Sequence, residues 1–81
     1  MAKFEVHWVR WVDAEAEAEW KHFSKIDMEV IPVETVGIVV KENDEMLVLG
    51  LSFDPTNNEY NGLFYIPKGM VLSRSVVLQV D

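Results

Sequence analysis

The sequence contains no cysteine and only two histidines. Disulfide bonds are therefore excluded, and so are a cysteine nucleophile and a zinc ion bound by cysteine. The histidines, His7 and His22, have no short ligand spacing between them, so we expect no metal and no other cofactor. The four glycines, at positions 37, 50, 62 and 69, stand apart and form no phosphate-cradling cluster. The sequence therefore contains no glycine-rich nucleotide-binding motif.

Basic side chains are also scarce, with 7 Lys and Arg against 14 Asp and Glu and a net charge of −7. They are spread singly along the chain, so the overall field repels nucleic acids and anionic membranes. No apolar run approaches the ~18 residues of a membrane span, and charge at Lys3 and Glu5 interrupts any N-terminal signal peptide. We therefore expect a cytoplasmic protein without membrane contact, for which nucleic acid is a disfavoured partner.

The length of 81 residues, with 49% hydrophobic and 26% charged side chains, predicts one globular domain over residues 1–81. In chains below roughly 80 residues, the free energy gained by burying apolar surface nearly equals the entropic cost of ordering the chain. Small domains therefore depend on disulfides, metals or oligomerisation. The first two are not expected here. The sequence therefore predicts a homo-oligomer.

The N-terminal third predicts one strand and one helix. Residues 4–12 are rich in aromatic and β-branched types, which favour a strand. Its two faces would carry Val6, Trp8, Arg10 and Val12 on one side and His7, Val9 and Trp11 on the other. Asp13 is suited to cap a helix, and strong helix formers follow it, so we expect a short helix over about 13–24. Its apolar stripe would be Ala16, Trp20 and Phe23.

A β-hairpin is the clearest unit. Two apolar runs, 36–41 and 46–53, flank the polar turn 42–45. Alternation places Leu47, Leu49, Leu51 and Phe53 on one face, which we interpret as core. The second face of the hairpin is interpreted as a contact surface for the helix or for a neighbouring subunit. The interface residues that we expect there are Val39, Met46 and Val48.

The other segments extend this β pattern. We expect a short edge strand within 24–35, around Pro32, and a loop at 54–59. A strand at 60–66, a turn at 67–69 and one bent or two short strands over 70–80 complete the chain. Short strands with polar turns predict a mainly β protein, a small closed or half-closed barrel of about five strands with the one helix.

Residues 36–49, followed by Ile66-Pro67-Lys68-Gly69, resemble a group of short uncharacterised proteins encoded by bacteriophages and prophages. The resemblance spans about half the chain. It implies a viral or prophage origin, a bacterial host cell and a small SH3-like barrel. It implies no activity, because none is established for the group.

The segment 66–71 is also similar to the second motif of Sm-like proteins, an apolar strand followed by a basic residue, a glycine and a second apolar strand. Lys68 and Gly69 occupy the positions of the basic residue and the glycine, although Pro67 departs from the motif. This similarity implies nucleic-acid contacts at Lys68 and Gly69, with Arg74 close by in sequence. It also implies assembly by strand addition at exposed sheet edges.

Two function hypotheses follow, and neither is enzymatic. The first is an interaction module that self-associates or binds a host or viral protein through edge strands and exposed apolar residues. The alternative is an Sm-like RNA-binding or other nucleic-acid-binding protein centred on Lys68, Gly69 and Arg74, whose binding would weaken steeply with salt. We expect no catalytic residues, because nothing in the sequence indicates that the fold assembles a serine relay with a histidine, and the acids lack a buried pair. A small-ligand protein would instead require a pocket lined by convergent polar groups.

Overall fold

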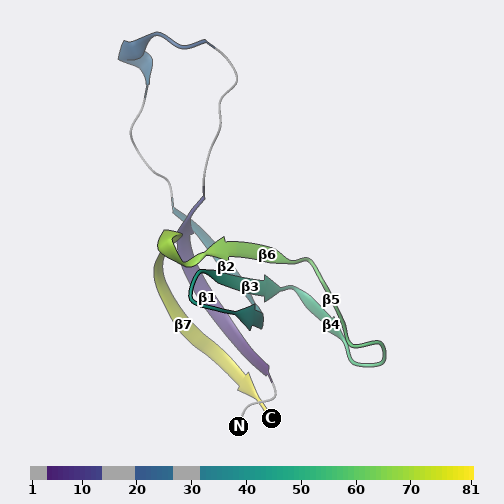
Figure 1. Ribbon diagram of the computed structural model, residues 1–81. Coiled ribbons are helices and arrows are strands. Elements are labelled where there is room, and N and C mark those ends of the chain that lie inside the picture. The colour runs from purple at the N-terminus through teal and green to yellow at the C-terminus, as the bar shows by residue number, and fades with distance from the viewer. Residues whose placement is uncertain (1–3, 14–19, 27–31) are drawn as a thin grey trace.

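The computed structural model describes residues 4–13, 20–26 and 32–81. In these residues the chain forms seven strands and two short 3-10 turns (Figure 1). The strands are β1 (Phe4–Val12), β2 (Pro32–Glu42), β3 (Met46–Gly50), β4 (Ser52–Asp54), β5 (Glu59–Asn61), β6 (Phe64–Pro67) and β7 (Val71–Val80), and the turns are η1 (Phe23–Lys25) and η2 (Lys68–Met70). The prediction of a mainly β protein is confirmed.

Five of the strands form one antiparallel sheet in the order β6-β3-β2-β1-β7, and β4 and β5 form a separate hairpin. The expected closed barrel is wrong, because β6 and β7 do not pair with each other within the described residues. The physical reason lies in η2. Only this short turn joins β6 to β7. The two strands run in different directions on either side of the turn, so no backbone hydrogen bonds pair them (Figure 1). The sheet is curved but open.

Strand β1 has the two faces that alternation predicts. His7, Val9 and Trp11 are buried, whereas Trp8 and Arg10 are exposed. We call the first side of the sheet the core face and the second the outer face. β1 pairs with β2 on one side and with β7 on the other, which places Phe4 opposite Val80.

The β2–β3 hairpin is also confirmed, and Asn43 closes its turn. The Asn43 Oδ1 atom accepts hydrogen bonds from the backbone N–H groups of Glu45 (2.9 Å) and Met46 (2.8 Å). The Asn43 N–H donates in turn to the Met46 carbonyl at 3.0 Å. An asparagine side chain that bonds its own backbone in this way makes the turn locally favourable.

The core is small and lies on the core face. It contains Val9, Trp11, Leu47, Leu49 and Ile66, and Val39 and Val71 pack against it. The expected core position of Leu51 is wrong, because this side chain is 59% exposed. Strand β3 ends at Gly50, and the Leu51 N–H donates to the Asn61 carbonyl at 3.0 Å instead of continuing the main sheet.

The β4–β5 hairpin packs against the start of β1 through three aromatic rings. The Phe53 ring centroid lies 4.9 Å from that of Phe4 and 4.8 Å from that of Tyr60. The expected loop between β4 and β5 is present. The Asp54 carboxylate organises it by accepting hydrogen bonds from the Thr56 N–H and from the Asn57 side-chain amide, both at 2.9 Å. The expected strand over 60–66 is divided in two at Gly62, between β5 and β6.

Gly62 is expected to be intolerant of a side chain. Its φ is +71°, a region that favours glycine, and a Cβ atom there would lie 2.7 Å from the Leu51 Cδ1 atom. We expect Gly62→Ala to lower the free energy of unfolding by about 1–2 kcal/mol, measured by urea denaturation. Gly69→Ala is the matched control, because nothing lies within 4 Å of its added Cβ. Equal effects of the two substitutions would contradict this explanation.

The helix expected over about 13–24 lies partly outside the described residues, which omit 14–19. In the described part, residues 20–22 have no regular structure and Phe23–Lys25 form a single 3-10 turn, so the prediction of a helix is not supported there. Short helices depend on burying an apolar face, and Trp20 and Phe23 are 104% and 87% exposed. The His22 ring also accepts the Ser24 N–H at 3.3 Å, a local alternative to helical pairing.

The edge strand expected around Pro32 is instead the start of β2, which lies inside the sheet between β1 and β3. Pro32 occupies the first residue of the strand, where a missing N–H does little harm. Residues 27–31 of the expected segment lie outside the described residues. Where the chain is described, no helix has the length and apolar character needed to cross a bilayer.

Candidate functional site

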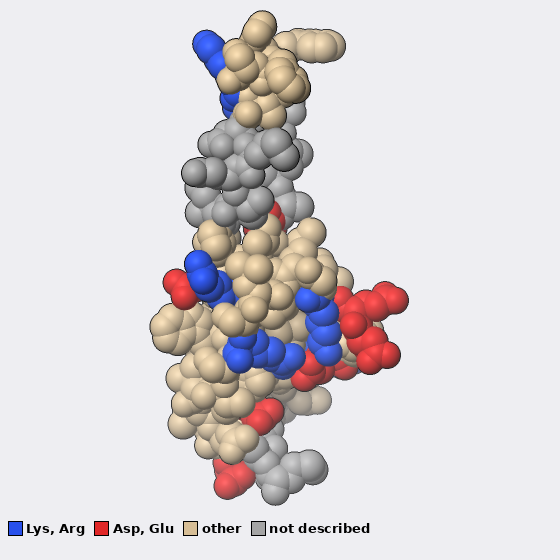
Figure 2. Space-filling model, turned by 90° about the vertical axis from the view of Figure 1, so that its left-hand side faces the viewer, with Lys and Arg blue, Asp and Glu red and all other residues tan. Residues whose placement is uncertain are grey.

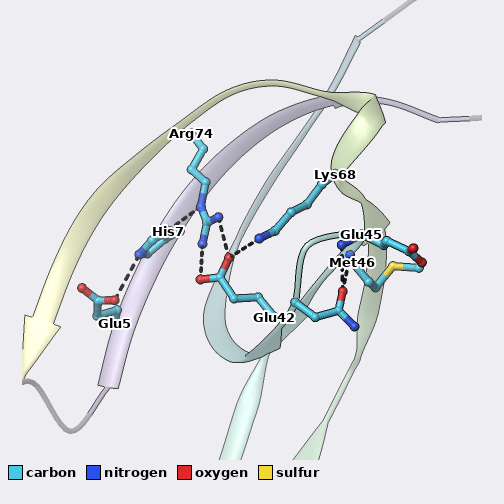
Figure 3. Close-up of polar contacts among 8 residues, drawn as sticks. Glu5, His7, Glu42, Glu45, Met46, Lys68 and Arg74 are labelled. Carbon is cyan, nitrogen blue, oxygen red and sulfur yellow. Dashed lines mark hydrogen bonds and ion pairs between the residues drawn. The ribbon is translucent and has the colours of Figure 1, made fainter.

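A cluster of charged side chains joins distant parts of the chain on the core face (Figure 3). Glu42, at the end of β2, is the cross-strand partner of buried Leu47, and Arg74 of β7 is the partner of buried Val9. Arg74 forms a bidentate pair with Glu42, with Nη1 donating to Oε2 at 2.9 Å and Nη2 donating to Oε1 at 3.1 Å. Because β1 separates β2 from β7, this contact requires a curved sheet.

Lys68 adds a second cation to the same carboxylate. Its Nζ atom lies 2.9 Å from Glu42 Oε2, and it comes from η2, the turn that joins β6 to β7. The backbone fixes this turn as well, because the Lys68 N–H donates to the Glu45 carbonyl at 2.8 Å. The cluster therefore ties η2 to the β2–β3 hairpin.

His7 extends the cluster along β1. Arg74 Nε donates to His7 Nδ1 at 3.1 Å, and since arginine only donates, the proton of the neutral ring is on Nε2. His7 is 7% exposed, and its Nε2 atom has no hydrogen-bond partner within the described residues. The Oε2 atom of Glu5 lies 3.6 Å from His7 Nε2, beyond good hydrogen-bond length.

Glu42 lies between two cations, Lys68 and Arg74, and compensates one of their two positive charges. The hydrogen bonds from Arg74 and Lys68 lower the pKa of Glu42 from 4.5 to about 2. Glu42 is therefore ionised at neutral pH, and it accompanies both cations that sequence similarity associates with nucleic acid. Gly69, the third residue of that set, is exposed beside them. The structure thus brings the three residues together, but with Lys68 and Arg74 both paired to a carboxylate.

The pKa of Glu42 predicts how stability depends on pH. Because folding lowers this pKa, the contribution of ionised Glu42 to the free energy of unfolding is present above about pH 4.5. It is lost as the pH falls toward 2. The side chain is 38% exposed, so we expect Glu42→Gln to cost about 1 kcal/mol at pH 7. Urea denaturation of both proteins between pH 7 and pH 2.5 should show the difference shrinking with acid. A difference that does not depend on pH would contradict the assignment.

The three expected interface residues do not share one face. Met46 and Val48 are half-buried on the side of β3 opposite to Leu47 and Leu49. Val39 is the cross-strand partner of Leu49 and packs against the core cluster. A register shift between Val39 and Lys41 accounts for this difference, because it changes which β2 residues face the core.

Strand β7 presents a long apolar edge that sequence reasoning did not single out. It has ten residues and pairs only with β1 among the described strands. Most of its apolar side chains are more than half exposed, namely Leu72, Val76, Val77 and Leu78, and Val80 is 41% exposed. Arg74 is its only charged residue. The feature of the sequence that could have identified this edge is the apolar, β-branched run over 71–80, which contains one charged residue.

The opposite edge of the sheet differs from β7. Strand β6 has only four residues and ends in Pro67, which lacks a backbone donor. Short strands and prolines are devices that protect a sheet edge from pairing with another chain. Figure 2 views the side of the molecule on which β7 lies in Figure 1, and most of the described surface on that face is neither acidic nor basic, apart from charged residues across its middle. The two edges are therefore unequal as sites of association.

These features define a small, open, antiparallel sheet with one long edge strand, β7, which pairs on one side only among the described strands. Comparisons with models of protein families, with curated proteins and with solved structures found no match. Within the residues that the structure describes, no three His, Cys, Asp or Glu side chains are grouped to hold a metal ion.

Proposed function

We propose that the protein is a non-enzymatic interaction module that self-associates by pairing β7 with β7 of a second copy. The observation that carries this proposal is the exposed edge of β7, ten residues long, apolar and charged only at Arg74. Unpaired backbone N–H and C=O groups on such an edge are a template for a further strand. The bidentate pair with Glu42 also compensates the one charge of the strand.

Antiparallel pairing suits a symmetric dimer. Two copies of one strand related by a two-fold axis present the same groups to each other, so every contact occurs twice. The two five-stranded sheets would become one continuous sheet, with exposed β7 side chains beside their counterparts. Apolar cross-strand neighbours of this kind stabilise pairing. A dimer would also provide the stabilisation that a small core cannot, as the sequence predicts.

The resemblance to short phage-encoded proteins extends the proposal to the cytoplasm of a bacterial host cell. There the same edge could accept a strand of a host or viral protein by the same backbone pairing. The alternative, nucleic-acid binding at Lys68, Gly69 and Arg74, has less support because Glu42 already holds both cations. A phosphate would have to compete with this carboxylate within a molecule of net charge −7.

Sedimentation velocity at micromolar concentration tests the self-association. We expect a dimer that strengthens as salt is added, because salt screens the repulsion between two molecules of charge −7. Leu78→Lys places a charge on an exposed β7 position and should give a monomer. Thr56→Lys adds the same charge to the exposed β4–β5 loop and should leave the dimer intact.

Two results would contradict the proposal. The first is a wild-type protein that stays monomeric at every salt concentration. The second is a dimer that Leu78→Lys does not weaken. Titration with a random RNA pool separates the alternative, because binding to RNA would weaken steeply as salt is added, the opposite of the dependence expected for the dimer.

A further inference from the structure

The outer face of the sheet carries a shallow concavity that the β7 edge does not explain. It has a volume of about 240 Å³ and is lined by Trp8, Arg10, Glu34, Ser73 and Ser75. These side chains come from three adjacent strands, β7, β1 and β2. All five are exposed, so a ligand can reach them from solvent. Four of the five carry polar groups, and polar groups beside an apolar surface are what a small-ligand site requires.

Strand register fixes the layout of this concavity. Trp8 is the cross-strand partner of Ser75, and Arg10 is the partner of both Ser73 and Glu34. Cross-strand partners project from the same face, so the five side chains form two neighbouring rows. With ordinary strand spacing and rise, the rows cover a footprint of about 10 Å by 7 Å. This regular backbone holds the site without a flexible loop.

The polar groups of the site are not engaged elsewhere. Arg10 and Glu34 are directly opposite each other and of opposite charge, yet neither has a hydrogen bond or an ion pair in the described part of the chain. Trp8 is 48% exposed, so its indole is accessible to a ligand on this face. The site therefore combines an apolar aromatic face with a free donor group, a free acceptor group and two hydroxyls.

We infer that this concavity binds a neutral saccharide unit. Its volume of about 240 Å³ is below the roughly 300–1,000 Å³ of clefts that hold drug-sized ligands. Glu34 and the net charge of −7 disfavour an anion, and Arg10 disfavours a cation. A sugar ring offers a C–H face for the Trp8 indole and hydroxyls that both donate and accept, which matches Arg10, Glu34 and the serines.

A zwitterionic amino acid is the competing ligand. Its two charged groups would satisfy Arg10 and Glu34, but they would leave Ser73 and Ser75 without a role. A saccharide uses both rows of the site and the indole face, so the observations favour it. The site also goes beyond the proposed self-association, because pairing of β7 uses backbone groups at the sheet edge and leaves side chains on the outer face open.

Titration of the full chain with cellobiose and with N,N′-diacetylchitobiose, followed by NMR, tests the inference. We expect the indole N–H signal of Trp8 to shift and saturate, while the signals of Trp11 and Trp20 stay in place. Trp8→Ala and Arg10→Ala should each weaken binding about tenfold or more. Tyr65→Ala is the matched control, because Tyr65 is a 62% exposed aromatic on β6, three strands from β1.

Parallel titrations with L-leucine and with inorganic phosphate define the outcomes. Shifts at Trp8 with a saccharide alone would support the inference, provided that the saccharide-induced shifts of the Ser73 and Ser75 backbone amides are lost in Trp8→Ala and retained in Tyr65→Ala. It would be overturned by the absence of any saccharide-induced shift, by shifts at Trp8 with L-leucine or phosphate instead, or by saccharide binding that survives Trp8→Ala. Repeating the titration with Leu78→Lys separates the two proposals, because saccharide binding should persist in a protein that no longer dimerises.

Discussion

Replacing Leu49 with alanine is expected to lower the free energy of unfolding by about 2–5 kcal/mol. Leu49 is 0% exposed and lies in the core cluster with Val9, Leu47 and Ile66. Truncation removes buried apolar surface and leaves a cavity that a sheet of fixed register fills only in part. Since domains of this kind have about 5–15 kcal/mol of stability in total, the loss should be plain in urea denaturation.

Leu51→Ala is the matched control for this core prediction. The same residue type stands two positions further along, but it is 59% exposed, so we expect a loss of less than about 1 kcal/mol. Leu49→Met, which conserves volume, should cost less than about 1.5 kcal/mol and would keep the comparison measurable if Leu49→Ala does not fold. Equal losses in Leu49→Ala and Leu51→Ala would show that the core extends past the end of β3.

The second large effect is expected at Thr35, whose hydroxyl accepts a hydrogen bond from Trp11 Nε1 at 3.0 Å. Both residues are buried, with Thr35 8% and Trp11 7% exposed. Thr35→Val keeps the shape of the side chain but leaves the indole N–H without a partner. We expect a loss of about 1–3 kcal/mol in urea denaturation, because an unsatisfied buried donor retains its desolvation cost.

A double-mutant cycle identifies the hydrogen bond as the cause. Trp11→Phe removes the donor, so adding Thr35→Val to it should cost less than Thr35→Val costs in the wild-type protein. The difference is the coupling energy of the pair, expected at about 0.5–3 kcal/mol for residues in contact. Additive losses would mean that the indole N–H finds another partner once the threonine hydroxyl is gone.

Much of the local structure follows from sequence patterns. Alternation in β1 separated His7, Val9 and Trp11 from Trp8 and Arg10 without indicating which face is buried, and the polar turn at 42–45 marked the β2–β3 hairpin. These features depend on neighbouring residues alone. The error at Leu51 has a local origin as well, since alternation extends through 53 but the backbone leaves the main sheet after Gly50.

The features that failed or were missed depend on contacts between distant residues. A helix at 13–24 required an apolar partner surface, and the described Trp20 and Phe23 contact none that buries them. The barrel required β6 to meet β7. The cluster of Glu42, Lys68 and Arg74 joins residues that are 26 and 32 positions apart, which no short motif encodes.

The candidate binding surfaces were also beyond sequence reasoning. Arg10, Glu34 and Ser73 share one row only because β1 lies between β2 and β7 with a fixed register. The exposure of β7 likewise depends on the order of strands in the sheet, which places this apolar strand at the edge. Sequence alone identified exposed edges as the expected mode of assembly but not which edge is available.

The most direct measurement of the central claim is amide hydrogen exchange at low and at high protein concentration. We predict that the β7 amides that do not bond to β1 become protected as concentration rises, while the β6 edge amides do not change. Such amides are open in a monomer and bonded in a dimer that pairs β7 with β7. Unchanged exchange along β7, or new protection along β6 alone, would contradict self-association through the β7 edge.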